Sequence, residues 1–243
     1  MLQHRKTGKE RINLSERLSD AANNLKGVDK MKKNVVIVER KTTMEADKAV
    51  LEFDCAVREI TAALDSGKVR PSASGLVSDF SGLVRDTSGL VRDASGLVRD
   101  ASGLVSDSET AELYKDLAKK TRNLCKETAR FSRYARRFTD LATTVDASGL
   151  VSDASGLVSD ACSIIRNASG LVSDALELVS NMNSKEKISQ LKETAENLKE
   201  KADELEKHAS YVDPTDISSV IKNVSGLVRD ASGLVRDTSG VLR

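Results

Sequence analysis

The side chains that could act in catalysis or bind a metal are few and scattered. The only histidines are His4 and His208, and the three cysteines, Cys55, Cys125 and Cys162, lie far apart without a Cys-x-x-Cys pair. Neither set has the spacing of a zinc site or a disulfide framework, and no phosphate-binding glycine motif is present. We therefore expect no metal, no cofactor and a reducing compartment, with a cytoplasmic location as the default.

Serine and aspartate recur every seven residues within the unit Ala-Ser-Gly-Leu-Val-Arg/Ser-Asp. A serine nucleophile needs a neighbouring base, and this unit carries none. On a helix, aspartates at this spacing lie about 10 Å apart, too far for two of them to bind one cation. The unit therefore predicts a structural role, and we expect no enzymatic activity.

One cluster of charged residues suggests a binding surface. Six basic residues follow three- and four-residue spacing: Lys119, Arg122, Lys126, Arg130, Arg133 and Arg137. We call them the basic stripe, because a helix would place them on one face, opposite a seam containing Leu117, Phe131 and Phe138. Three roles remain open: a face that is solvated or docked on acidic repeat helices, contact with anionic lipid, and binding of nucleic-acid phosphates without base reading.

The seven-residue unit itself predicts amphipathic helices. It forms three tracts, Ala73–Asp107, Ala147–Asn181 and Val224–Arg243. At about 100° per residue, Ala, Leu and Val fall on one stripe, while Ser, Gly, Asp and the Arg/Ser position cover the other face. A β-solenoid is the alternative, since Gly and Asp favour turns and Val favours strands. The unit lacks the two-residue alternation of a strand, however.

An isolated helix made of these units should be weak. Gly costs about 1 kcal/mol relative to Ala in a helix interior. No Arg and Asp of the unit lie three or four residues apart, so the helix has no ion pairs of its own. Burying a Leu or Val side chain contributes roughly 1.5–3 kcal/mol, so we expect the tracts to become helical only when this stripe packs against neighbouring helices. The small Ala and Gly residues should allow those helices to approach closely.

The segments between the tracts also carry helical signals. Asn13–Glu16 and Thr42–Glu45 fit capping boxes that would each begin a helix, and Gly67 fits a left-handed helix end. Val35–Val38, the one strand-like run, is interpreted as a buried helical segment or a connector. Asp213–Asp216, whose second residue is proline, predicts the turn between the last two helices.

Two of these segments have long apolar seams. The first consists of Leu117, Leu124, Phe131, Ala135, Phe138, Ala142 and Val145. The second has heptad spacing and consists of Ile188, Leu191, Ala195, Leu198, Ala202, Leu205, Ala209 and Val212. Both spacings are typical of helices that bury one face.

Together these signals predict an all-α protein, an elongated antiparallel bundle of six or seven long amphipathic helices with heptad repeats. The predicted segments are an N-terminal helical segment (1–70), the first repeat helix (71–107), the basic amphipathic helix (108–146), the second repeat helix (147–182), the a/d heptad helix (183–212) and the C-terminal repeat helix (213–243). Because the seam shifts by one residue between segments, we expect one folded helical domain rather than an uninterrupted coiled coil.

The composition argues against two classes of binding function. The net charge is +1 and aromatic residues make up 3%, which argues against general nucleic-acid binding and a deep ligand pocket. We expect a structural or protein-interaction scaffold that packs through its Ala/Leu/Val stripes, with a second copy of itself or another helical protein as partner. The alternative is a membrane-active amphipathic protein that binds an anionic membrane surface. Nucleic-acid binding through the basic stripe is the least favoured role.

Overall fold

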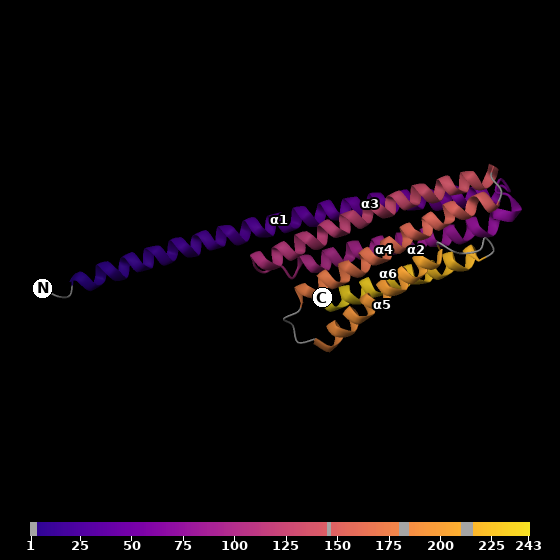
Figure 1. Ribbon diagram of the computed structural model, residues 1–243. Helices are drawn as coiled ribbons and strands as arrows, with labels where there is room; N and C mark the ends of the chain where they lie inside the picture. The colour runs from indigo at the N-terminus through magenta and orange to yellow at the C-terminus, as the bar shows by residue number, and fades with distance from the viewer. Residues whose placement is uncertain (1–3, 145–146, 180–184, 210–215) are drawn as a thin grey trace.

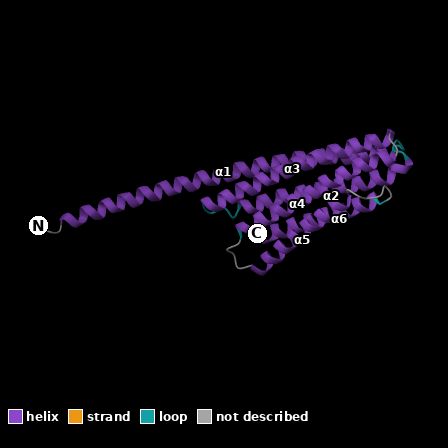
Figure 2. Cartoon of the chain, viewed as in Figure 1, coloured by secondary structure: helices purple, strands orange, loops and turns teal. Residues whose placement is uncertain are grey.

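The computed structural model describes residues 4–144, 147–179, 185–209 and 216–243, and these residues form six α-helices and no strand (Figures 1 and 2). The helices are α1 (His4–Asp65), α2 (Pro71–Ser102), α3 (Ser108–Thr144), α4 (Ala147–Leu178), α5 (Lys185–Ala209) and α6 (Ile217–Leu242). They pack side by side into an elongated bundle, beyond which the N-terminal part of α1 projects. The predicted all-α bundle of long amphipathic helices is confirmed.

Successive helices run in opposite directions, so α2, α4 and α6 all point the same way (Figure 1). These are the three repeat helices, and they contact one another as parallel neighbours. Antiparallel packing therefore describes helices that follow each other in the chain, whereas the repeat helices pack in parallel. Helices α2 and α4 each contact four others: α2 contacts α1, α3, α4 and α6, and α4 contacts α2, α3, α5 and α6.

The apolar core is continuous through the bundle and contains residues of all six helices. Most of the described Ala, Leu and Val positions of the repeat units are buried, as the helical wheel predicts; Leu83, Val84 and Ala94 of α2, for example, have no exposed surface. Phe80 takes the alanine position of one unit, and its ring centroid lies 4.7 Å from that of Phe138 on α3. The repeat helices thus form the centre of the core.

Helix α1 is a single helix of 62 residues, so neither predicted capping box begins a helix. Asn13 and Thr42 both lie inside it. The Thr42 hydroxyl donates to the Val38 carbonyl at 2.8 Å, a bond that a threonine makes within a helix. The prediction of a buried Val35–Val38 run is only partly correct, because Val35 is buried while Val36 and Ile37 are exposed.

The predicted left-handed helix end at Gly67 is confirmed, with a φ of 66°. Its N–H donates to the Leu64 carbonyl at 3.1 Å, and the Lys68 N–H donates to the Ala63 carbonyl at 3.2 Å. This pair of bonds satisfies carbonyls that would otherwise be left free at the end of α1. Pro71 then begins α2, where its lack of an N–H removes no helical hydrogen bond.

The first repeat helix ends at Ser102, not at Asp107 as predicted. After Ser102 the chain forms a tighter turn than an α-helix, in which the Gly103 N–H donates to the Asp100 carbonyl at 3.3 Å. Asp107 instead precedes α3, where its Oδ1 accepts the Thr110 backbone N–H at 2.8 Å. The hydrogen bonds from Thr110 hold the pKa of Asp107 below its ordinary value. The last aspartate of the tract therefore caps the N-terminus of α3 and does not extend α2.

The two apolar seams are buried in the structure. In α3 the buried members are Leu117, Leu124, Phe131, Ala135, Phe138 and Ala142. In α5 they are Ile188, Leu191, Ala195, Leu198, Ala202 and Ala209, while Leu205 is half-buried. Val145, Val212 and the predicted turn at Asp213–Thr215 lie outside the described residues. Helix α6 begins at Ile217.

Candidate interaction surfaces

Helices α2 and α6 are joined by a ladder of hydrogen bonds that repeats every seven residues. Four aspartates of α2 each accept a hydrogen bond from a serine that lies 139 residues further along the chain. The pairs are Asp79 with Ser218, Asp86 with Ser225, Asp93 with Ser232, and Asp100 with Ser239. The constant separation means that the two helices are parallel and aligned unit by unit.

A basic residue, in α6 or directly after it, completes each rung of this ladder. Lys222, Arg229, Arg236 and Arg243 approach the same four aspartates at 3.6, 3.6, 2.9 and 3.0 Å. The aspartate side chains are only 14–23% exposed, whereas the basic side chains are 66–72% exposed. The Ser and Asp positions, which the helical wheel places opposite the apolar stripe, therefore face a neighbouring helix here, because parallel packing turns the serine of one helix toward the aspartate of the other.

Residues 217–223, with the sequence Ile-Ser-Ser-Val-Ile-Lys-Asn, join the ladder as a diverged repeat unit. Ser218 and Lys222 occupy the positions of Ser and Arg in the unit, and both contact Asp79. The predicted third tract begins only at Val224 and leaves this segment out. Its Ser and Lys, four residues apart as in the regular units, are the signal that could have identified it.

The repeat helix α4 uses the same positions for other partners. Asp174 forms an ion pair with Lys120 of α3 at 2.6 Å. On its other side, Arg166 of α4 contacts Asp203 at 2.8 Å and Glu206 at 2.6 Å, both on α5. The Arg166 guanidinium holds the pKa of Glu206 below its ordinary value. Helix α4 is thus held between α3 and α5 by ion pairs.

Two residues of the basic stripe contact α1 in the structure. Arg122 donates to the Thr42 hydroxyl of α1 at 2.9 Å, and Arg133 contacts Glu52 of α1 at 3.1 Å. The stripe residues Lys119, Lys126, Arg130 and Arg137 are exposed. Arg136, outside the stripe, forms two bonds of 2.6 and 2.9 Å with Glu59 of α1. The docked part therefore meets mainly α1, which is not a repeat helix.

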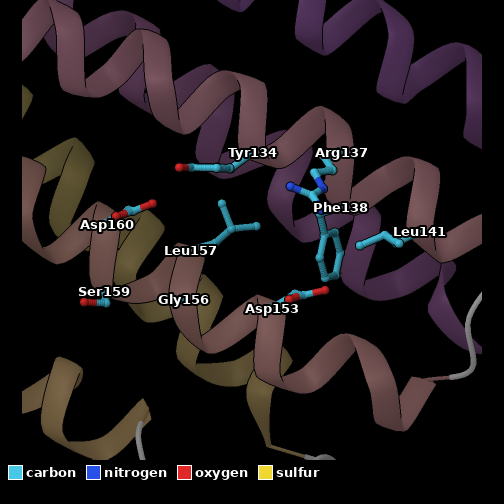
Figure 3. A pocket seen from close by; sticks show the side chains of 9 residues that line it. All are labelled: Tyr134, Arg137, Phe138, Leu141, Asp153, Gly156, Leu157, Ser159 and Asp160. Atoms are coloured by element: carbon cyan, nitrogen blue, oxygen red, sulfur yellow. The ribbon is translucent and has the colours of Figure 1, made fainter.

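Arg137 lines a hollow of about 550 Å³ between α3 and α4 (Figure 3). Asp153 and Asp160 lie in this hollow on either side of Leu157. Burial raises the pKa of Asp160, and the positive charge of Arg130 partly opposes this effect. The Ser159 hydroxyl donates to Glu206 of α5. The charged groups of this hollow are thus one arginine and two aspartates, and its serine contacts a neighbouring helix.

A second exposed surface, which we did not predict from the sequence, lies on the outer side of α1. Ile37, Met44 and Leu51 are 64%, 66% and 62% exposed there. Together with Lys41 and Lys48 they form what we call the α1 outer row. A hollow of about 620 Å³ along this row is lined by residues of α1 alone. The seven-residue spacing of the three apolar residues is the signal that could have revealed the row.

Among the described residues, no group of three His, Cys, Asp or Glu side chains is placed to hold a metal ion. None of the helices there combines the length and the apolar content needed to cross a membrane. Comparison with known proteins gave no match, whether to a family model, a curated protein or a solved structure.

Proposed function

We propose that this protein is a non-catalytic helical scaffold that acts through contacts with other proteins. The α2–α6 ladder is the observation that carries the proposal. It joins helices from distant parts of the chain, with four rungs in one register. A hydrogen bond to a charged group contributes about 1.5–3 kcal/mol, so the rungs stabilise one alignment of the bundle. A bundle held in this way keeps its outer surfaces in fixed positions, as a scaffold requires.

The repeat units support this function from inside the molecule. Most of their described Ala, Leu and Val side chains are buried against neighbouring helices of the same chain. Partners, whether a second copy of the chain or another helical protein, would therefore bind the outer surfaces of the bundle. Tandem duplication of such units lengthens a bundle without changing the surface that each unit needs to bury.

Gentle extraction followed by size-exclusion chromatography with light scattering tests the proposal. We expect the chain in an assembly of defined stoichiometry that is larger than its own 26.2 kDa. A chain that elutes at 26.2 kDa in extracts and at every concentration of the purified protein contradicts the scaffold function.

Binding to an anionic membrane surface is the second candidate, favoured by the exposed part of the basic stripe. Lys119, Lys126 and Arg137 are exposed on α3, and Tyr134 beside them is 45% exposed. Flotation with anionic vesicles at low salt, compared between the native chain and K119E/K126E, tests this role. Loss of flotation in the variant supports membrane binding, and no flotation of the native chain excludes it.

Because nucleic-acid phosphates could attract the same residues, a salt titration with duplex DNA tests the third role, nucleic-acid binding.

A further inference from the structure

A hollow of about 370 Å³ in the groove between α1 and α2 is lined mainly by positive charge. Its lining residues are Asp54, Val57 and Arg58 of α1 and Arg85, Ser88 and Arg92 of α2. Three arginines against one aspartate give this lining a net charge of +2. All three arginines are exposed, so a ligand can reach them from solvent.

Ser88 lies in the wall of this hollow and has a hydroxyl without a partner. The residue is only 3% exposed, and its Oγ is buried without a hydrogen bond. Because buried polar groups are nearly always hydrogen-bonded in folded proteins, such a hydroxyl calls for an explanation. Arg85 and Arg92 lie three residues before and four residues after Ser88, on the same face of α2. An anion held between their guanidinium groups therefore lies above Ser88 and can accept its hydrogen bond.

The α2–α6 ladder shows what a serine and a basic residue at these positions bind. In each rung, the serine and the basic residue four positions later approach the same carboxylate. Ser225 and Arg229, for example, both contact Asp86. Ser88 and Arg92 occupy the same two positions of their own repeat unit. They therefore have the spacing to hold an oxyanion in the same way.

Helix α1 supplies only part of the acidic partner that this site needs. Asp54 contacts Arg92 at 3.4 Å but accepts no hydrogen bond from Ser88. Since α1 and α2 are antiparallel (Figure 1), Thr61, seven residues after Asp54, lies level with Arg85, seven residues before Arg92. A threonine carries no charge, and among the described residues Arg85 forms no ion pair. This arginine is therefore free to bind a ligand.

The other acids next to these arginines face different helices or lie outside the hollow. Asp86 belongs to the ladder, and Glu59 forms two bonds with Arg136 of α3. Asp65, at the end of α1, does not line the hollow. The Arg58 Nε donates to the backbone carbonyl four residues before it at 3.1 Å. This bond positions the guanidinium group, and its two terminal nitrogens have no partner in the described part of the chain.

We propose that this hollow binds a phosphate group, held by Arg58, Arg85 and Arg92 and by the Ser88 hydroxyl. Guanidinium groups bind phosphate through paired N–H donors, and a phosphate has enough oxygens for several of them and for the hydroxyl. A dianion also matches the net charge of +2, whereas a carboxylate has one charge and two oxygens. The site is separate from the outer surfaces proposed for protein partners and goes beyond the scaffold function.

Isothermal titration calorimetry of the full chain at constant ionic strength tests the site with inorganic phosphate, O-phosphoserine and acetate. We expect saturable binding of both phosphate probes and at least about tenfold weaker binding of acetate. R85Q should weaken phosphate binding about tenfold, because it removes hydrogen bonds to a charged group. R99Q, the matched control, changes the same repeat position of α2 outside the hollow and should bind like the native chain. D54N should tighten binding, since it removes the negative charge from the lining.

Ser88→Ala separates a binding role from a structural one. Without phosphate, the Tm of S88A should equal or exceed that of the native chain, because the variant removes a buried hydroxyl that has no partner. Its affinity for phosphate should fall at least about threefold. Phosphate should consequently raise the Tm of S88A less than that of the native chain. A lower Tm of S88A without phosphate would show that the hydroxyl is bonded within the protein, and would overturn the proposal.

The probes also distinguish the sources of the phosphate group. Equal affinities for inorganic phosphate and O-phosphoserine identify the phosphate group alone as the ligand, and tighter binding of O-phosphoserine identifies a phosphate ester; both results support the site. Binding without saturation, equal losses in R85Q and R99Q, or an unchanged affinity in S88A overturns it. Acetate binding as tight as phosphate binding would make it a carboxylate site. Flotation with phosphatidic acid vesicles, when neither soluble phosphate binds, would make it a membrane contact.

Discussion

Several glycines of the repeat units occupy helical positions that do not require glycine. A Cβ atom added at Gly82, Gly96 or Gly233 would meet no atom within 4 Å, and at Gly89 it would meet only the Ser232 hydroxyl at 3.9 Å. The expectation that glycine allows close helix approach is therefore wrong at these positions. The small alanines of the stripe, not the glycines, face the neighbouring helices.

Replacing Gly82 by Ala should consequently stabilise the protein. We expect the free energy of unfolding to rise by about 1 kcal/mol, because Ala loses less conformational entropy in a helix than Gly. Gly67→Ala is the matched control and should lower it, since Gly67 has a φ of 66°. Urea unfolding followed by circular dichroism measures both changes, and a loss of stability in G82A would contradict the helical assignment of this position.

Asp160 gives a pH-dependent prediction, because burial raises its pKa in the folded protein. Ionisation of Asp160 then costs stability, and the cost is present at neutral pH and disappears as the pH falls below about 4. Asp160→Asn should therefore raise the Tm at pH 7 by about 1–3 °C and leave it unchanged near pH 3. Asp153→Asn, in the exposed position of the preceding unit, is the control with little expected change. A lower Tm for D160N at pH 7 would show that attraction by Arg130 outweighs desolvation.

At the scale of the helices, the ladder explains how units with weak intrinsic helix propensity form stable helices. Asp and Arg of one unit cannot pair along their own helix, yet Asp86 of α2 accepts from Ser225 of α6 and lies 3.6 Å from Arg229. The exposed Arg contributes about 0–1 kcal/mol, so the less exposed Asp–Ser bond is the stronger part of each rung.

A double-mutant cycle on Asp86 and Ser225 measures one rung. Each alanine substitution should cost about 1–2 kcal/mol, and the double variant should cost less than the sum, with a coupling of about 1 kcal/mol. Asp230→Ala, at the same repeat position but exposed on α6, should change stability by less than about 0.5 kcal/mol. Additive losses in the double variant would mean that the Asp–Ser bond does not stabilise the helix pair.

The identity of the units also makes the effect of deletions depend on their length. Removing Ala94–Asp100 shortens α2 by about 10 Å and turns the following residues by about 20°, so the other rungs stay in phase. Removing Ser95 alone turns them by about 100° and moves buried Leu and Val toward water. Thermal melts should show a smaller loss of Tm for the seven-residue deletion, and the opposite order would contradict the equivalence of the units.

Local signals in the sequence predicted the helices better than their pairing. The wheel of one unit identifies the buried Ala, Leu and Val, and Gly67 marks the end of α1, because both depend on neighbouring residues. Thr42 failed as a helix start because burial of Ala46 and Phe53 keeps α1 continuous through it. The ladder could not be predicted, since identical units fit any pairing of the three tracts. The contacts of the basic stripe with α1 depend on Thr42 and Glu52, which only the fold brings close to Arg122 and Arg133.

At the scale of the whole molecule, the helices differ in how much of their length the bundle supports. Helix α1 extends beyond the other helices on its N-terminal side (Figure 1). The described side chains from Lys26 to Asn34 are exposed, apart from the half-buried Met31. Among the described side chains of α1 burial begins at Val35, so the contacts seen to stabilise this helix lie in its C-terminal part.

Removal of residues 1–26 should therefore shorten the helix without weakening the bundle. We expect the helical signal to fall in proportion to the residues lost, while the Tm changes by less than about 2 °C, because helix outside the bundle contributes little to the cooperative core. Removal of residues 1–46 is the contrasting variant. It deletes Val35 and Ala46, which are buried, and the hydrogen bond between Thr42 and Arg122, and it should lower the Tm well beyond that limit. Circular dichroism melts at two protein concentrations measure both variants. A large drop for the shorter deletion that grows with protein concentration would reveal that the projecting part of α1 packs against a second copy, and would contradict the view that only the bundle stabilises this helix.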